Sequence, residues 1–416
     1  MGKKMNSKKK TKKQKVTIQT VGQWLINKVD TPEYRSGKVT GKKHPKKQEL
    51  LDGLVKEGIL TSGQMLEQVR ALERAGLIVV SWTSVNSDFK GITFPVENMQ
   101  ALCKYEKIKN PNLLLQEIRE CIERYDSETK TEWLHKYYRQ VLLRALEKGN
   151  IPENTKDENL FKVLNALGAL ENDIWKRKFS SDVLNDSKIF ENLYENKTIT
   201  ILRNYSPRVI DEMEDYQVLA EHHILNYSQT LEWKGAITYR IQNSTNPLEQ
   251  TTVNTTGMFY GTTLNAQTLT NAVPISLMAV KKVITIENKA NYENMTYDPK
   301  ILYIYVHGFL SPKERAFLTK LEKVADESVE FYHWSDLDYG GIRIFQFMKK
   351  NVFQNVKPLY MDRKTYEDAL QKGAGIPVEV NKLVKIKEID AGELEELKQC
   401  ILQYGKEIEQ ENLIDN

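Results

Sequence analysis

The spacing of apolar positions divides the chain into segments with different predicted structures. Between residues 45 and 75, apolar side chains recur at three-to-four spacing in PKKQELLDGLVKEG and TSGQMLEQVRALERAG, which predicts two helices. Thr61 or Ser62 suits the N-cap of the second helix, and Gly76 suits a left-handed end. LIVVSWTS and FKGITFPV, joined by the polar VNSD, predict two strands of a hairpin. Two helices followed by a hairpin are typical of a winged-helix (CAP-like) module, which we place at residues 19–105.

The middle of the chain predicts helices and then a segment of mixed character. LLLQEIRECIERY, EWLHKYYRQVLLRALEKG and NLFKVLNALGALENDIW each carry an apolar stripe at helical spacing, so we interpret residues 106–182 as a helical connector. Trp133, Tyr137 and Tyr138 in this block suit its core better than a stacking surface. Residues 183–275 form a mixed segment that leads into the next domain.

Two features of the mixed segment have no assigned role. Its Thr/Asn-rich part, residues 243–270, is low in charge and rich in turn formers, which predicts loops or short strands. His222 and His223 are adjacent, and adjacent side chains on a helix point in different directions, so a shared metal ion is not expected.

The last third of the chain alternates short apolar runs with helical patterns. KKVITIE (281–287), ILYIYVHG (301–308), VEFYHWSD (329–336) and VKPLYMD (356–362) predict strands, and SPKERAFLTKLEKVAD and GGIRIFQFMKKN predict helices between them. This alternation predicts a mainly parallel, Rossmann-like sheet with right-handed crossovers over residues 276–416. The chain as a whole is therefore predicted to be a multidomain α/β protein.

Composition adds limits to this picture. An apolar content of 40% over 416 residues suits two or three folded domains. No segment has the roughly 20 consecutive apolar residues that span a bilayer, and the lysine-dense start does not resemble a signal peptide. The three cysteines, Cys103, Cys121 and Cys400, lie far apart, which excludes a complete disulfide framework and a thiolate zinc site. We therefore expect a cytoplasmic protein without a membrane contact.

The positive charge is concentrated near the amino terminus. Residues 1–15 contain eight lysines and no acidic residue, so residues 1–18 are predicted to be a disordered tail. A second basic cluster, RSGKVTGKKHPKK, covers residues 35–47. Such runs are either solvated surface or phosphate contacts, and lysine contacts phosphates without sequence selectivity. The predicted DNA-binding residues are Lys42, Lys43, Lys46, Lys47 and Arg70.

Carboxylates gather where the predicted strands end. Glu287 ends the first strand of the last domain, and Asp336 and Asp338 follow the third. Ligands of parallel sheets bind beyond these strand ends, and residues i and i+2 of an extended segment face the same side. If the two strands are neighbours, three oxygen ligands meet, which suits Mg²⁺ or Mn²⁺ better than Zn²⁺. Such an ion holds a phosphate and activates water for phosphodiester attack. The simpler alternative is that Asp338 caps the following helix.

The same residues resemble a known family. Glu at one strand end and DxD at a later strand end are similar to the Toprim domain of topoisomerases, primases and some nucleases. VITIENKANYENM, YVHGFLSPKERAFLTKL and WSDLDYGGIRI resemble JetD, the nuclease subunit family of Wadjet plasmid-defence systems, whose Toprim fold is related to the A subunit of topoisomerase VI. FSSDVLNDSKIFENL, the closing EIEQEN and the amino-terminal winged-helix region resemble that family as well, so the likeness covers most of residues 45–416.

This resemblance implies a function and a set of site residues. It implies a magnesium-dependent DNA endonuclease that cleaves closed circular plasmid DNA as a homodimer, supplied with DNA by an SMC-like ATPase complex (JetABC type). Glu287, Asp336 and Asp338 are implied to be the catalytic metal ligands. Further positions that match family motifs without an assigned role are Lys188, Gly308 and Gly341, and Glu409 and Glu411 either add acidic charge near the site or form a solvated helix end.

Two alternatives are left open by the sequence. Topoisomerase VI and its relatives cut DNA with a tyrosine that becomes covalently linked, and Tyr34 in TPEYRSGK stands where such a tyrosine is expected. A type IIB-like topoisomerase subunit is therefore the first alternative. The second is a non-catalytic DNA-binding adaptor with a metal-free Toprim domain, which the presence of Glu287, Asp336 and Asp338 disfavours.

Overall fold

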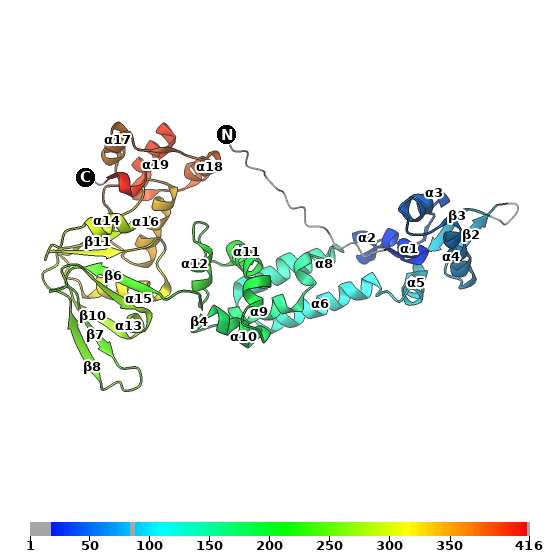
Figure 1. Cartoon of the computed structure of the whole chain (residues 1–416), viewed down its shortest axis with the longest axis horizontal. Coiled ribbons are helices and arrows are strands. Elements are labelled where there is room, and N and C mark those ends of the chain that lie inside the picture. The colour runs from blue at the N-terminus through cyan, green and yellow to red at the C-terminus, as the bar shows by residue number, and fades with distance from the viewer. Residues whose placement is uncertain (1–17, 84–87, 414–416) are drawn as a thin grey trace. The chain divides into compact units, whose positions relative to one another are not determined.

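The computed structural model describes residues 18–83 and 88–413, so nearly all of the predicted lysine-rich tail lies outside the described residues. The chain forms two compact units, which divide between Ala169 and Leu170 (Figure 1). Helices and strands are both abundant, as the predicted multidomain α/β class requires.

The first part of unit 1 contains the two predicted helices followed by the predicted hairpin, together with further short elements that were not predicted. Its helices are α1 (Val21–Val29), α2 (Pro32–Arg35), α3 (Lys47–Leu50), the π-helix η1 (Leu51–Val55), α4 (Ser62–Arg74) and α5 (Met99–Tyr105), and its strands are β1 (Lys42–Lys43), β2 (Val79–Trp82) and β3 (Phe89–Pro95). Thr61 caps α4, and Gly76 adopts φ +70° after it, as the sequence indicated. The strand order is β1-β3-β2, and β1 was not predicted. DNA binding by this region stays a prediction.

The second part of unit 1 is helical. It contains α6 (Pro111–Glu128), α7 (Glu132–Lys136), the π-helix η3 (Tyr137–Leu143), α8 (Arg144–Glu147) and α9 (Glu158–Gly168). Trp133, Tyr137 and Tyr138 are buried, which confirms that these aromatic residues belong to the core. The predicted connector ran to residue 182, whereas the division between the units comes at Ala169.

Unit 2 begins with a mainly helical region. Its elements are β4 (Ile174–Trp175), α10 (Lys176–Leu184), the π-helix η5 (Phe190–Tyr194), α11 (Glu195–Tyr205), α12 (Asp215–Ala220) and β5 (Ile224–Leu225). The two adjacent histidines have different partners. His222 Nε2 lies 2.8 Å from Ser206 Oγ, and His223 Nδ1 lies 3.0 Å from Asp173 Oδ1.

A six-stranded sheet organises the rest of unit 2, in the order β14-β13-β11-β12-β6-β9. Its strands are β6 (Thr230–Lys234), β9 (Thr262–Asn265), β11 (Lys282–Ile286), β12 (Ile301–Tyr305), β13 (Glu330–Trp334) and β14 (Lys357–Pro358). The pairs β11–β12, β11–β13 and β13–β14 are parallel, as predicted, whereas β6 and β9 are antiparallel. The sheet therefore extends upstream of residue 276, where the sequence placed the domain boundary. The edge strand β9 is TTLN, which lacks the apolar run that identified the other strands.

Unit 2 also contains a three-stranded sheet with the strand order β10-β7-β8. It contains β7 (Thr238–Gln242), β8 (Gln250–Asn254) and β10 (Ala272–Ser276), with α13 (Ala266–Asn271) before β10. The Thr/Asn-rich segment thus forms the short strands β8 and β9, as predicted, and also the helix α13.

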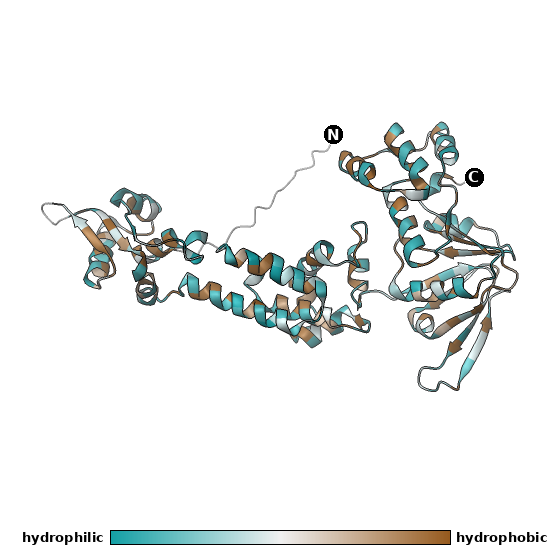
Figure 2. Cartoon of the chain, turned by 180° about the vertical axis from the view of Figure 1, so that it is seen from behind, coloured by the Kyte–Doolittle hydropathy of each residue, from teal (hydrophilic) through white to brown (hydrophobic). Residues whose placement is uncertain are grey.

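Helices cover the main sheet because alternate residues of its strands point to opposite faces. α14 (Lys289–Asn294), α15 (Pro312–Val324) and α16 (Tyr339–Asn351) follow β11, β12 and β13 in turn. Phe331 and His333 of β13 pack against Phe353 and Phe345, while Trp334 belongs to an apolar cluster on the other face. Figure 2 shows hydrophobic and hydrophilic residues alternating along many of the helices.

The carboxyl-terminal part completes unit 2 with α17 (Arg363–Gln371), β15 (Ile376–Pro377), α18 (Val380–Glu388), α19 (Glu395–Tyr404), β16 (Lys406–Glu407) and the 3₁₀ helix η7 (Gln410–Leu413). β15 pairs with β16. Within residues 18–83 and 88–413, no helix combines the length and the apolar character needed to cross a bilayer.

Candidate active site

The carboxylates singled out in the sequence follow two neighbouring strands. β11 and β13 pair in parallel, with Ile286 opposite Trp334. The Glu287 backbone N–H donates to the Trp334 carbonyl at 3.1 Å, so Glu287 lies beside the start of the DxD turn. The condition that these two strands are neighbours is met, so Glu287 and Asp336 lie at the same edge of the sheet.

The segment at residues 408–413 contacts this edge of the sheet. The Gln410 backbone N–H donates to Asp336 Oδ1 at 2.6 Å, and the Gln410 side chain donates to the Trp334 carbonyl at 3.2 Å and accepts from the Asn288 N–H at 2.9 Å. Leu337 and Ile408 form an isolated antiparallel bridge. Gln410 is fully buried. The segment at 408–413 therefore fixes the orientation of the Asp336 carboxylate.

Asp338 has the role that the simpler alternative assigned to it. Its Oδ1 accepts the Gly341 N–H at 2.7 Å and caps α16. Within the described residues, no group of three or more Asp, Glu, His or Cys side chains is arranged to hold a metal ion. This arrangement differs from the expectation that all three carboxylates face one point, because the helix amide competes for the Asp338 oxygen.

The carboxylates nevertheless form a connected electrostatic group. Burial and then the charge of Asp336 raise the pKa of Glu287 to about 8, with Asp338 adding to the effect. The pKa of Asp336 is raised to about 6, chiefly by burial. The hydrogen bond from the Gln410 N–H opposes this rise, and the negative charges of Asp338, Glu411 and Glu409 add to it. Burial also raises the pKa of Asp338, although the Gly341 N–H and Lys382 oppose this. A cation in this group would relieve the repulsion between the carboxylates.

One buried oxygen supports the fit to a divalent cation. Glu287 Oε2 is buried and has no hydrogen-bond partner within the described part of the chain. An unpaired buried carboxylate oxygen costs free energy unless a cation or proton binds it. Glu287 and Asp336 therefore suit Mg²⁺ or Mn²⁺ by ligand type, burial and raised pKa, and Asp338 adds negative charge beside them.

The raised pKa of Glu287 gives a prediction for the metal-free protein. Since its folded pKa of about 8 exceeds the ordinary 4.5, the folded state binds more protons between these pH values, and its free energy of unfolding falls as the pH rises through that window. Glu287→Gln mimics the protonated form at every pH. In EDTA the variant should be more stable than the wild type, and this advantage should grow by roughly 3 kcal/mol between pH 5 and pH 8. Denaturant titrations at both pH values test this, and a pH-independent difference would contradict it.

Gly341 now has a structural role. A Cβ atom there would lie 2.0 Å from the Asp336 carbonyl oxygen and 2.9 Å from Ser335 Oγ. Only glycine lets the first turn of α16 approach the DxD backbone this closely. Gly308, which follows β12, adopts φ +88°, a conformation that favours glycine.

The remaining predicted residues of unit 2 differ in their relation to the site. Glu409 and Glu411 flank Gln410, and their charges act on Asp336, so they add acidic charge near the site. Lys188 is exposed in the turn after α10, and the structure assigns it no contact with the carboxylates. Sequence reasoning missed Gln410 and Lys382. Lys382 of α18 pairs with Glu407 at 3.1 Å and opposes the rise that burial causes in the pKa of Asp338.

The predicted DNA-binding residues of unit 1 are mostly exposed. Lys42 and Lys43 form the exposed strand β1, and Lys46 precedes α3. Lys47 pairs with Asp88, and the Arg70 guanidinium lies 5.3 Å from the centre of the Trp82 ring. These positions are compatible with phosphate contact. The assignment stays a prediction.

Tyr34 has the features of a structural residue. It lies in α2 with 6% of its surface exposed, and burial raises the pKa of its hydroxyl. A tyrosine that attacks a phosphate needs access to DNA and an easily ionised hydroxyl. Both properties disfavour a covalent role.

Comparisons with known proteins identify the family. A family model described as Wadjet protein JetD, C-terminal, matches residues 251–416. A Wadjet protein JetD from Bacillus cereus (strain Q1) is 30% identical over 294 residues, which cover 68% of this chain and 69% of the relative. The chain belongs to the Wadjet JetD family. The JetD carboxyl-terminal match contains the whole carboxylate group, including Glu287, Asp336 and Asp338, together with Gln410.

Proposed function

We propose that this chain is the magnesium-dependent endonuclease of a Wadjet system and that it cleaves closed circular plasmid DNA. The observation that carries the proposal is the group of buried carboxylates with raised pKa values at the carboxyl edge of a mainly parallel sheet. Perturbed carboxylates at such an edge are typical of sites that work on phosphates with a divalent cation. Membership of the JetD family supports the same proposal.

The residues have separate tasks in this proposal. Glu287 and Asp336 hold Mg²⁺, and Asp338 adds negative charge while it caps α16. Bound Mg²⁺ supplies positive charge for the scissile phosphate and lowers the pKa of water. The Gln410 N–H keeps the Asp336 carboxylate in place, and Gly341 keeps α16 against the DxD turn.

Partners complete the proposal. Lys42, Lys43 and Lys46 contact the backbone of double-stranded plasmid DNA, and an SMC-like ATPase complex delivers that DNA. Homodimerisation provides one site for each strand of a duplex, because a two-fold pair presents two copies of the same site. The protein acts in the cytoplasm without a membrane.

The experiment that tests this function is plasmid cleavage. The purified chain, combined with the SMC-like complex from its own system and ATP, should linearise closed circular plasmid in Mg²⁺ and leave it intact in EDTA. Intact plasmid in Mg²⁺, with the motor shown to be active, would overturn the nuclease assignment and favour the adaptor alternative.

The topoisomerase alternative makes a different prediction for Tyr34. Tyr34→Phe removes only a buried hydroxyl, so cleavage should remain within about threefold of wild type, and no protein should stay on the DNA ends after detergent. The measurement is gel analysis of the cleaved ends with and without protease. An inactive Tyr34→Phe variant, together with protein-linked ends from wild type, would favour the topoisomerase alternative.

A further inference from the structure

A second feature of unit 2 is a basic groove that lies outside the carboxylate group. It has a volume of about 720 Å³ and is bordered by residues 207–210, by Glu221 and by one side of α15 and α16. Its charged lining consists of four cations and one carboxylate, namely Arg208, Arg315, Arg343, Lys350 and Glu221. The lining therefore carries a clear excess of positive charge.

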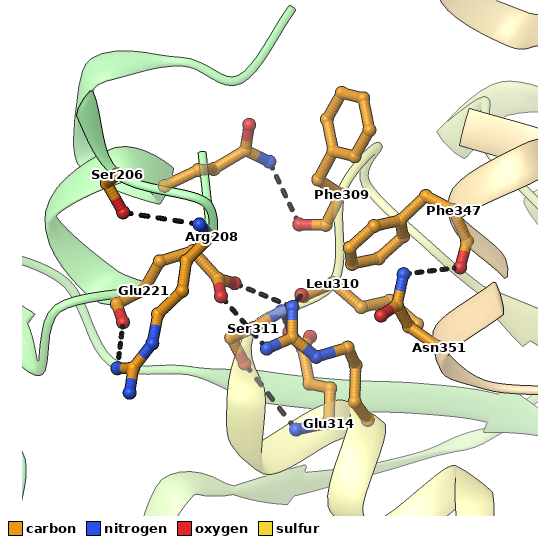
Figure 3. A network of polar contacts seen from close by, with 11 residues as sticks. Ser206, Arg208, Glu221, Phe309, Leu310, Ser311, Glu314, Phe347 and Asn351 are labelled. Atoms are coloured by element: carbon orange, nitrogen blue, oxygen red, sulfur yellow. Dashed lines mark hydrogen bonds and ion pairs between the residues drawn. The ribbon is translucent and has the colours of Figure 1, made fainter. Parts of the chain in front are cut away.

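Partly buried hydrogen bonds and an ion pair hold one wall of this basic groove in place. Glu221 binds the Arg315 guanidinium through both carboxylate oxygens, at 2.6 and 3.0 Å. The Glu221 backbone carbonyl accepts from Arg208 Nη1 at 3.2 Å, and Ser206 Oγ accepts the Arg208 N–H, as Figure 3 shows. The one carboxylate of the groove is thus already paired. Within the described residues, the Arg208 guanidinium donates to a neutral carbonyl oxygen and forms no ion pair, so its positive charge is not neutralised.

The α16 wall adds cations that are weakly engaged. Arg343 lies 3.4 Å from Glu212, which also pairs with Lys385 at 3.5 Å, so one carboxylate is shared by two cations. Lys350 is exposed and has no hydrogen-bond or ion-pair partner within the described part of the chain. Gln346, which lies between them on the same helix, accepts from Arg343 Nη1 at 3.3 Å and donates to the Asp390 carbonyl. Both cations have capacity left for an anionic ligand.

We propose that this basic groove binds the phosphates of the DNA strand next to the cut, an inference that rests on the proposed nuclease function. The planar guanidinium of arginine matches the spacing of two phosphate oxygens. Cations spaced along one helix suit the repeating phosphates of a DNA strand better than one small anion. α16 starts beside Asp338, so Arg343 and Lys350 lie roughly 7 and 18 Å along the helix from the carboxylate group. At about 3.4 Å per nucleotide, these distances correspond to phosphates two to five positions from the cut.

A salt titration of DNA binding tests this inference without cleavage. The full-length chain is compared with Arg343→Gln/Lys350→Gln in EDTA, using a 30-base-pair duplex. Each lost phosphate contact should make the log–log dependence of affinity on salt shallower by about 0.9, so the double variant should lose roughly 2 units of slope. The matched control is Lys320→Gln/Lys349→Gln, which removes the same charge from α15 and α16 outside the groove lining. Its slope should stay within about 0.5 of wild type.

The outcomes separate this inference from the proposed function. If the salt dependence of DNA affinity becomes shallower only in Arg343→Gln/Lys350→Gln, the result supports phosphate binding by the groove. This conclusion holds even if the wild-type protein does not cleave plasmid. Equal slopes for both double variants would overturn it, as would a wild-type chain without measurable DNA binding. Tripolyphosphate distinguishes a free anion from the DNA backbone. If it raised the unfolding temperature of wild type but not of the groove variant while the DNA slopes coincided, the groove would be a small-anion site and the inference would be wrong.

Discussion

Asp336→Asn is expected to lower plasmid cleavage by on the order of 10³-fold or more, with the fold and DNA binding retained. The substitution keeps the size of the side chain and the oxygen that accepts the Gln410 N–H, but it removes the charge that a divalent cation needs. Because Asp336 is repelled by Asp338 and the neighbouring acidic residues, its neutralisation should not destabilise the metal-free protein. The measurement is the rate of plasmid linearisation in Mg²⁺ by the complete system.

Glu287→Gln should give a loss of the same size, since Glu287 carries the buried unpaired oxygen. Glu411→Gln is the matched control, because it neutralises an exposed carboxylate of η7 that acts on the same group only through its charge. Its cleavage rate should stay within a few-fold of wild type. Near wild-type cleavage by Asp336→Asn would show that the site lies elsewhere.

Gly341→Ala is the second substitution with a large expected effect. The added Cβ would lie 2.0 Å from the Asp336 carbonyl oxygen, a backbone atom that moves only if α16 or the DxD turn moves. Such overpacking costs typically 1–3 kcal/mol, and a displacement of about 1 Å at a catalytic group costs on the order of 10²-fold in rate. We expect lower stability in denaturant titration and a cleavage rate reduced by roughly that factor.

The neighbouring Gly340 provides the control. A Cβ at Gly340 would lie 3.3 Å from Asp338 Oδ1, a side-chain atom that adjusts by a few tenths of an ångström. Gly340→Ala should therefore remain folded and retain most of the cleavage rate. Equal behaviour of the two variants would contradict the role assigned to the close approach at Gly341.

The parallel strands of the main sheet could be predicted because their sequences are short apolar runs. β11 and β13 are nearly continuous in β-branched and aromatic residues, and their ends place Glu287 and Asp336 at one edge once the crossover rule is applied. The sequence analysis did not assign β6 and β9 to this sheet. The edge strand β9 is polar, and antiparallel pairing over a long sequence separation leaves no local signal. KTITILRNY is rich in β-branched residues and yet lies within the helix α11, because packing outweighs local propensity.

The acidic residues of the site could be predicted from the sequence, but their hydrogen-bond partners could not. Glu287 and Asp336 were found from their strand-end positions. Gln410 was not, because it acts through a backbone N–H on a residue 74 positions away. For Asp338 the sequence offered both a metal ligand and a helix cap. The structure shows the cap, a choice that depends on how closely Gly341 brings the helix amide to the carboxylate.

Manganese binding tests the central claim most directly, since Mn²⁺ occupies the same oxygen sites as Mg²⁺ and is detected by electron paramagnetic resonance without any cleavage. The account predicts that wild type and Tyr34→Phe bind Mn²⁺ with the same affinity, and that Glu287→Gln and Asp336→Asn each bind it at least about tenfold more weakly. Equal Mn²⁺ affinity for all four proteins would contradict the assignment of Glu287 and Asp336 as the metal ligands.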